Sequence, residues 1–230
     1  MGHGDFQVLV YAPASVQEMA DYVTKAFDMA DRFRMPALIL ADGMLGQMME
    51  PVTFADGEIK MSDASAKPWA TNGHGNKRPH NIVNSLYLQA EELEFHNVER
   101  FRRYEQVMAE CPEAEAYLTD DADIVVAAYG STARLARSAV ETARSRGIKA
   151  GLVRPITLWP FPEKQIKAAC ANARRVLVTE MSMGQMVDDV KLAIECRLPV
   201  SFFGRTGGVI PKPSEIFAQI VKLDEELKGE

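Results

Sequence analysis

Five loops in this sequence carry residues that could bind a ligand, because each follows an apolar run and contains glycine, hydroxyl or charged residues. They are Asp42-Gly43, Gly130-Ser131-Thr132, Arg154-Pro155, Glu180-Met181-Ser182 and Gly204-Arg205-Thr206-Gly207-Gly208. Ligands of open parallel sheets bind outside the carboxyl ends of the strands, so a binding site is expected among these loops.

Two of these loops suggest a specific chemistry. Gly130-Ser131-Thr132 could hold an anion on free backbone amides at the start of a helix, although Ser or Thr there is more often a helix cap. The segment 204–208 lacks the Gly-Lys-Ser/Thr ending of a phosphate loop, so it predicts a tight backbone path and no nucleotide site. We take Arg205 and Asp42 as candidate contacts for a partner surface or an anion.

Residues that ligate metals or act as nucleophiles form no recognisable set. The histidines and cysteines are His3, His74, His80, His96, Cys111, Cys170 and Cys196. Their spacing matches neither a zinc site nor an iron–sulfur site, and no Gly-x-Ser-x-Gly elbow is present. We predict no metal in this chain and expect any redox centre on another one.

Composition narrows the class of protein. The chain has 230 residues, 47% of them hydrophobic, and its 26 basic and 32 acidic side chains give a formal net charge of -6. This charge is not typical of a nucleic-acid-binding protein or of one held on an anionic membrane. No segment approaches the ~20 apolar residues of a membrane span, and no signal peptide is recognisable, so we expect a cytoplasmic protein.

The first 50 residues predict one strand–helix–strand unit. Residues 6–12 are rich in β-formers, and Ser15 with Glu18 forms a capping box for a helix that ends before Pro36. The apolar stripe expected to face the core comprises Val16, Met19, Ala20, Val23, Phe27 and Ala30. The run 37–40 is apolar without alternation, which predicts a strand buried on both faces.

The middle and the last third differ in character. Residues 51–81 are polar and punctuated by Gly and Pro, which indicates an arm, and 84–110 predicts a long amphipathic helix. The apolar face of that helix is expected to comprise Val98, Phe101, Tyr104 and Met108. From residue 123, apolar strands alternate with single helices, which predicts an α/β fold with a mostly parallel sheet and helices on both of its faces.

Several separated segments together resemble the alpha chain of the 2-oxoacid:ferredoxin oxidoreductases, and most closely the branched-chain (2-oxoisovalerate) type. These segments are His3-Gly4-Asp5, VLVYAPASVQEM, LILADGMLGQMMEPV, KPWATNG, GIKAGLVRPITLWPFP, VLVTEMSMGQM and FFGRTGGVIP. The resemblance implies that residues 1–58 are the C-terminal part of a thiamine-pyrimidine-binding domain. It further implies that 59–120 are an arm and connecting helix, and that 121–230 are a transketolase-C-terminal-like domain.

The resemblance also implies an activity, oxidative decarboxylation of a 2-oxoacid to acyl-CoA. The cofactor would be thiamine diphosphate with Mg²⁺, bound in the full complex and not by this chain alone. Beta and gamma chains and a ferredoxin-like chain would be the partners, with iron–sulfur clusters on partner chains and with coenzyme A and ferredoxin as reactants. The family's catalytic glutamate lies before the point where this sequence starts, so no catalytic residue is assigned, and His3, Gly4 and Asp5 are the candidates for lying near cofactor or substrate.

Alternatives remain open. The chain could be a non-catalytic structural or assembly module of such a complex, or a 2-oxoglutarate- or pyruvate-specific member of the family. A transketolase or a 2-oxoacid dehydrogenase beta chain is disfavoured by the GRTGG and ADGMLGQ segments. A pyrimidine domain that starts part-way leaves a strand edge and an apolar helix face uncovered, so we expect the chain to be oligomeric.

Overall fold

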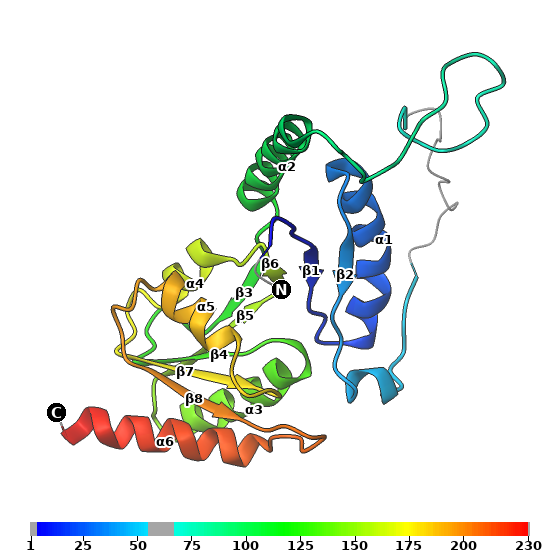
Figure 1. The fold of residues 1–230 in the computed structure, drawn as a ribbon. Coiled ribbons are helices and arrows are strands. Elements are labelled where there is room, and N and C mark those ends of the chain that lie inside the picture. Colours follow the sequence, from blue (N-terminus) through cyan, green and yellow to red (C-terminus); the bar gives the residue numbers. More distant parts are fainter. Residues whose placement is uncertain (1–3, 55–66, 230) are drawn as a thin grey trace. The chain divides into compact units, whose positions relative to one another are not determined.

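The computed structural model describes residues 4–54 and 67–229 (Figure 1). The chain forms two compact units: one combines residues 1–52 with 103–230, and the other comprises 53–102. The larger unit carries two sheets and almost all of the helices, so it is the unit that positions any site.

The smaller sheet of this unit is built from both ends of the sequence. Its order is β2-β1-β6, with β1 parallel to β2 and antiparallel to β6. The strands are β1 (Leu9–Tyr11), β2 (Ala37–Ile39) and β6 (Thr157–Trp159), and α1 (Val16–Phe33) connects β1 to β2. The predicted strand–helix–strand unit is confirmed, whereas the pairing with β6 was not predicted.

The cap of α1 also follows the sequence prediction. The Ser15 hydroxyl accepts a hydrogen bond from the Glu18 backbone N–H at 3.1 Å. The Glu18 carboxylate reaches back one residue further than a capping box requires and accepts from the Ala14 N–H at 2.7 Å. Arg34 ends the helix in the left-handed conformation, just before Pro36.

The larger sheet has the order β3-β5-β4-β7-β8 and is parallel except for β3. Its strands are β3 (Ala114–Tyr117), β4 (Ile124–Ala127), β5 (Ala150–Pro155), β7 (Arg175–Glu180) and β8 (Val200–Gly204). Its helices are α3 (Gly130–Ser145), α4 (Glu163–Ala169), α5 (Met186–Ala193) and α6 (Pro213–Gly229). The predicted mostly parallel α/β fold is therefore confirmed.

Both faces of this sheet are buried, as the unbroken apolar strands predicted. Alternate residues of β4 pack into two different core clusters, Ile124 and Val126 with α3 and α6, and Val125 and Ala127 with α4 and α5. Figure 1 shows the two helix pairs on opposite sides of the sheet. Because β4, β7 and β8 run parallel to one another, their carboxyl ends emerge together at one edge of the sheet.

Two predictions about the first 50 residues are wrong in detail. The core-facing residues of α1 are Tyr22, Ala26 and Phe33, whereas Phe27 is 70% exposed. Helix α1 carries two adjacent apolar stripes, and the sequence alone does not say which of them meets the sheet. Val23, in the stripe predicted to be buried, is likewise exposed.

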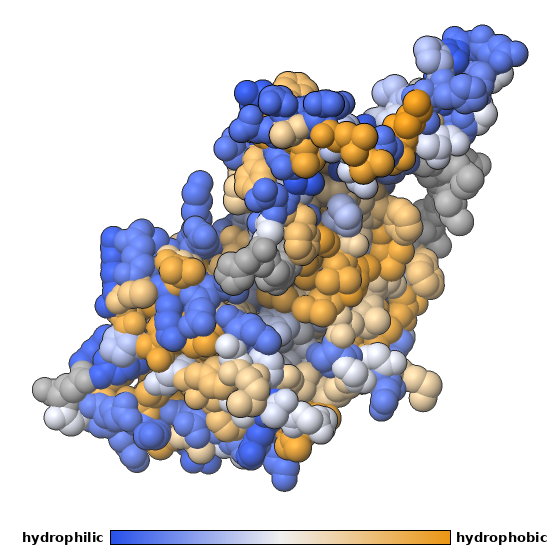
Figure 2. Space-filling view, in the orientation of Figure 1, coloured by the Kyte–Doolittle hydropathy of each residue, from blue (hydrophilic) through white to orange (hydrophobic). Residues whose placement is uncertain are grey.

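The strand expected to be buried on both faces is also only partly covered. Ala37 and Ile39 pack against the core, but Leu38 and Leu40 are 46% and 42% exposed. The reason is that β2 pairs only with β1 and is the edge of its sheet within the described residues. Figure 2 shows apolar side chains gathered over this part of the surface.

The helix expected from residue 84 begins later. Helix α2 (Ala90–Glu110) starts at Ala90. Before it, the Asn84 side chain accepts a hydrogen bond from the Leu86 N–H, which competes with helical hydrogen bonding at the start of the expected helix. In the larger unit, Tyr104 and Val107 at the end of α2 are buried against β1, whereas the predicted core residue Met108 is 48% exposed. In the smaller unit, the predicted face residues Val98 and Phe101 are 48% and 41% exposed.

Candidate functional site

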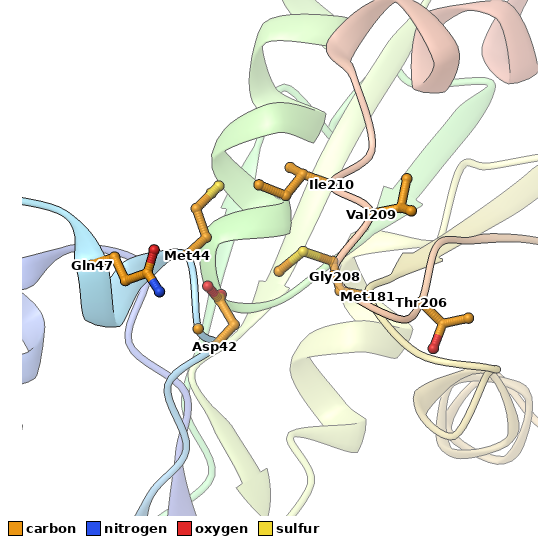
Figure 3. A pocket seen from close by; sticks show the side chains of 9 residues that line it. Asp42, Met44, Gln47, Met181, Thr206, Gly208, Val209 and Ile210 are labelled. Atoms are coloured by element: carbon orange, nitrogen blue, oxygen red, sulfur yellow. The ribbon is translucent and has the colours of Figure 1, made fainter.

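Loops at the carboxyl ends of β2, β7 and β8 enclose a pocket of about 370 Å³, which we call the Asp42 pocket (Figure 3). Its lining residues are Asp42, Gly43, Met44, Gln47, Met181, Thr206, Gly208, Val209 and Ile210. A smaller hollow of about 150 Å³ shares Asp42 and Met181 with it and is otherwise lined by Leu40, Ala41, Tyr129, Gly130 and Thr132. Four of the five loops singled out in the sequence therefore meet here, while Arg154-Pro155 lines neither space.

Asp42 connects two segments that are distant in the sequence. Its Oδ2 accepts hydrogen bonds from the Ser131 N–H at 3.1 Å and from the Ser131 hydroxyl at 2.5 Å. Its Oδ1 accepts from the Leu45 N–H at 2.8 Å, which caps the short 3₁₀ helix Leu45–Gln47. The expected self-capping of α3 by its own Ser or Thr is wrong, since Tyr129 is the N-cap residue and the Asp42 carboxylate supplies the anion that favours a helix N-terminus.

Gly130 is required at this junction. Its φ is +60°, and a Cβ atom placed on it would lie 3.2 Å from Asp42 Oδ2. Any other residue would be strained and would also crowd the carboxylate. The glycine therefore permits Asp42 to approach the first turn of α3.

A second carboxylate, that of Glu180, is buried at the end of β7. It accepts from the Met186 N–H at 3.2 Å, the Val187 N–H at 3.1 Å and the Ser182 hydroxyl at 2.9 Å. Glu180 thus caps α5 from within the sheet. Burial raises the pKa of the Tyr129 phenol, and the nearby carboxylates of Glu180 and Asp42 raise it further. The contribution of these two carboxylates indicates a negative potential beside the smaller hollow.

Arg205, the cationic candidate, does not line the Asp42 pocket. It forms an ion pair with Glu215 of α6 and lies over the Phe203 ring, 5.6 Å from its centroid. The backbone hydrogen bond from Lys212 and the Arg205 charge lower the pKa of Glu215. Gly204, in the same segment, has no room for a side chain, because a Cβ would lie 2.6 Å from the Ser182 carbonyl oxygen.

An ion pair between Glu18 and the buried Arg154 joins residues 1–52 to 103–230. Arg154, 7% exposed, binds the Glu18 carboxylate through both terminal nitrogens at 2.8 and 2.9 Å. Its Nε donates to Glu115 at 3.0 Å. This network has no signature in the sequence, since Arg154 is separated from Glu18 by 136 residues and from Glu115 by 39.

Of the remaining candidates, those that the structure describes do not line the site. His3 lies outside the described residues, and Gly4 and Asp5 are exposed and line neither the Asp42 pocket nor its neighbour. In the part of the chain that the structure describes, no group of three or more His, Cys, Asp or Glu side chains could hold a metal ion. Burial raises the pKa of the Cys170 thiol to about 11, so this thiol is protonated and unreactive.

No helix among the described residues is both long and apolar enough to cross a bilayer. What the site offers chemically is the Asp42 carboxyl group between sulfur-containing and aliphatic walls.

Comparison with known families identifies both parts of the chain. Residues 1–115 match the family "pyruvate flavodoxin/ferredoxin oxidoreductase, thiamine diphosphate-binding", and residues 122–216 match "pyruvate:ferredoxin oxidoreductase core domain II". The ketoisovalerate oxidoreductase subunit VorB of Methanothermobacter thermautotrophicus is 41% identical over 219 residues, which are 95% of this chain and 61% of VorB. The 2-oxoglutarate synthase subunit KorA of Methanothermobacter marburgensis is 31% identical over 247 residues, 96% of this chain and 65% of KorA. The chain therefore spans about three fifths of the length of these relatives.

Two solved structures share the fold. The 2-oxoglutarate:ferredoxin oxidoreductase from Magnetococcus marinus, solved with 2-oxoglutarate, coenzyme A and succinyl-CoA bound, aligns with a TM-score of 0.73 at 19% identity. That alignment covers 96% of this chain and 43% of the other. A split-gene transketolase, described as an inactive beta4 tetramer, aligns with a TM-score of 0.52 at 14% identity and covers 94% and 56% of the two chains. Both likenesses agree with the α/β architecture predicted from the sequence.

Proposed function

The chain belongs to the pyruvate flavodoxin/ferredoxin oxidoreductase family, and from this premise we propose that it is the alpha-chain component of a thiamine diphosphate-dependent 2-oxoacid:ferredoxin oxidoreductase. The proposed reaction is oxidative decarboxylation of a branched-chain 2-oxoacid to its acyl-CoA, with electrons passed to ferredoxin. The observation that carries the proposal is the identity to the ketoisovalerate oxidoreductase subunit along nearly the whole chain, which exceeds that to the 2-oxoglutarate synthase subunit.

The division of labour follows from what the described residues can hold. Thiamine diphosphate supplies the carbanion chemistry of this reaction type. We assign it, with Mg²⁺, to the complete complex and not to this chain alone, because no group of three or more His, Cys, Asp or Glu side chains among the described residues could hold a metal ion. Iron–sulfur clusters are assigned to partner chains, because the three cysteines of this chain are far apart in sequence. Beta, gamma and ferredoxin-like chains, coenzyme A and ferredoxin complete the proposed cytoplasmic assembly.

Individual residues take supporting roles in this proposal. The N-terminal His3, Gly4 and Asp5 are proposed to lie near cofactor or substrate in the complex. Asp42 and Arg205 are proposed as subunit-interface contacts, since one opens into a surface pocket and the other lies on the neighbouring loop. The proposed domain division remains 1–58, 59–120 and 121–230.

The substrate class is tested on the complex purified through an affinity tag on this chain from its own host. Reduction of ferredoxin is measured with 2-oxoisovalerate, 2-oxoglutarate and pyruvate, each with coenzyme A. We expect kcat/KM to be at least about tenfold higher for 2-oxoisovalerate. Pyruvate lacks the branched alkyl carbons that an aliphatic pocket binds, and the second carboxylate of 2-oxoglutarate is costly to bury in such a pocket. A preference for 2-oxoglutarate or pyruvate would assign the chain to the corresponding branch of the family.

A second candidate function is that of a non-catalytic assembly module. It is supported by the sequence, in which no titratable acid or base is paired with a recognisable cofactor motif. A complex that forms and turns over equally well without this chain, but loses stability, would favour this alternative over the first.

A further inference from the structure

The Asp42 pocket carries a single formal charge. Among its lining residues Gln47 and Thr206 are neutral, and the others besides Asp42 are apolar or glycine. No lysine, arginine or histidine of the described residues pairs with the Asp42 carboxylate. At about 370 Å³ the pocket is at the small end of the range of ligand sites, which suits one side chain better than a coenzyme.

The hydrogen bonds of Asp42 leave one acceptor position free. A carboxylate offers about four lone-pair positions. Oδ2 is saturated by its two bonds from Ser131, whereas Leu45 is the one donor to Oδ1 among the described residues. Figure 3 shows the carboxylate directed into the space between Met44 and Met181.

The walls of the pocket are aliphatic. Met44 and Met181 approach from two different loops, and Ile210 lies beside them (Figure 3). The rim is apolar as well, since Val209 is 56% and Ile210 43% exposed. Methionine and isoleucine side chains of this kind suit an alkyl stem.

We propose that this pocket binds the side chain of a lysine from a partner subunit, with its alkyl stem against Met44, Met181 and Ile210 and its ammonium group on Asp42 Oδ1. The partner follows from the proposed function, whereas the chemistry of the pocket does not depend on it. Lysine is favoured over arginine because only one acceptor position is free, and the guanidinium group gains most from binding both carboxylate oxygens. An anionic 2-oxoacid is excluded by the charge of Asp42.

The chemistry is tested with n-butylammonium, which reproduces the end of a lysine side chain. The full chain is labelled with ¹³C at its methionine methyl groups, of which it has twelve, and the signals of Met44 and Met181 are assigned with the variants Met44→Leu and Met181→Leu. We expect n-butylammonium to shift these two signals saturably, with N-butylguanidinium binding more weakly and butyrate not at all. Equal shifts with butyrate, or no shift at either methyl group, would overturn the proposal.

Variants separate binding from folding. Asp42→Asn is expected to abolish the saturable shift, and Asp28→Asn, which changes an exposed carboxylate on α1, should leave it unchanged. Asp42 is also a cap, so Asp42→Asn could disturb the loop. Ile210 lines the pocket and has no capping role, so a charge placed there should change binding of the n-butylammonium cation through electrostatics alone. We expect Ile210→Lys to weaken this binding by about fivefold and Ile210→Glu to strengthen it by about threefold. Changes of the same sign in both variants would contradict the assignment.

The partner is tested in the complex itself. Zero-length carbodiimide cross-linking followed by mass spectrometry should join the Asp42 peptide to a lysine of another subunit, and this link should disappear in Asp42→Asn. Cross-links of Asp42 only to lysines of its own chain would refute the interface. The methyl titration uses the chain without any 2-oxoacid, so its outcome is independent of the oxidation assay. A failed titration refutes the lysine pocket, whereas a failed oxidation assay refutes the proposed function.

Discussion

Replacing Arg154 by methionine should destabilise the larger unit strongly. The Arg154 side chain is 9% exposed and makes charge-assisted hydrogen bonds at 2.8, 2.9 and 3.0 Å, two to Glu18 and one to Glu115. Removing one partner of a fully buried ion pair costs roughly 3–5 kcal/mol, because the remaining charge is left without compensation. The Glu18 and Glu115 side chains are 27% and 44% exposed and regain some hydration, so we expect a loss of ~2–3 kcal/mol.

A double-mutant cycle tests the cause of this loss. In the Arg154→Met background, Glu18→Gln removes a carboxylate that has lost its partner. The substitution Glu18→Gln should therefore lower the free energy of unfolding less in this background than in the wild type, with a coupling energy of ~1–2 kcal/mol. The assay is urea unfolding followed by far-ultraviolet circular dichroism. Arg134→Met, which removes a more exposed ion pair with Glu50, is the control and should have a smaller effect.

The same network predicts a pH dependence. Burial by itself raises the pKa of Glu18, but the hydrogen bonds from Arg154 and Ala14 and the Arg154 charge outweigh it, and the pKa lies below its ordinary value of 4.5. The contribution of ionised Glu18 is therefore complete above about pH 4.5 and is lost as the pH falls through the lowered pKa. The stability difference between the wild type and Glu18→Gln should narrow below pH 4.5. A cost of Arg154→Met within ~0.5 kcal/mol of zero, or no coupling to Glu18, would refute the reasoning.

Three further predictions concern the same architecture. Gly130→Ala should cost ~1–3 kcal/mol in the same urea assay, because it places a Cβ at positive φ beside Asp42, and an unchanged midpoint would contradict the role of the glycine. Limited proteolysis should cut first within 53–102, with 1–52 remaining bound to 103–230 on size exclusion because both belong to one compact unit; early loss of 1–52 would contradict this. The isolated chain should contain no iron–sulfur cluster, so stoichiometric iron with visible absorption would refute the assignment of clusters to partner chains.

Elements fixed by local patterns were predictable from the sequence. The Ser15 cap and the apolar runs of β4, β5 and β7 carry their own signals, so the strand–helix order and the two-sided burial of the larger sheet followed. The short antiparallel strands β3 and β6 could not be predicted, because segments of four and three residues with mixed polarity are too short to show a hydrophobic periodicity.

The site was predictable only as a set of loops. Parallel topology brings strand ends together, but the bond between Asp42 and Ser131 spans 89 residues and leaves no local signature. The ion pair between Arg154 and Glu18 spans 136 residues and likewise leaves no local signature. For α1, the two apolar stripes were equivalent in the sequence, and packing against β1 and β2 selected the one that contains Tyr22.

The most direct test of the proposed function is coenzyme A-dependent reduction of ferredoxin by the complex purified through a tag on this chain, with 2-oxoisovalerate as substrate. We predict that partner subunits co-purify and that ferredoxin is reduced only when both the 2-oxoacid and coenzyme A are present. A mock purification from cells without the tag should show no such activity. An intact complex that reduces ferredoxin with none of 2-oxoisovalerate, 2-oxoglutarate and pyruvate would contradict the proposed function.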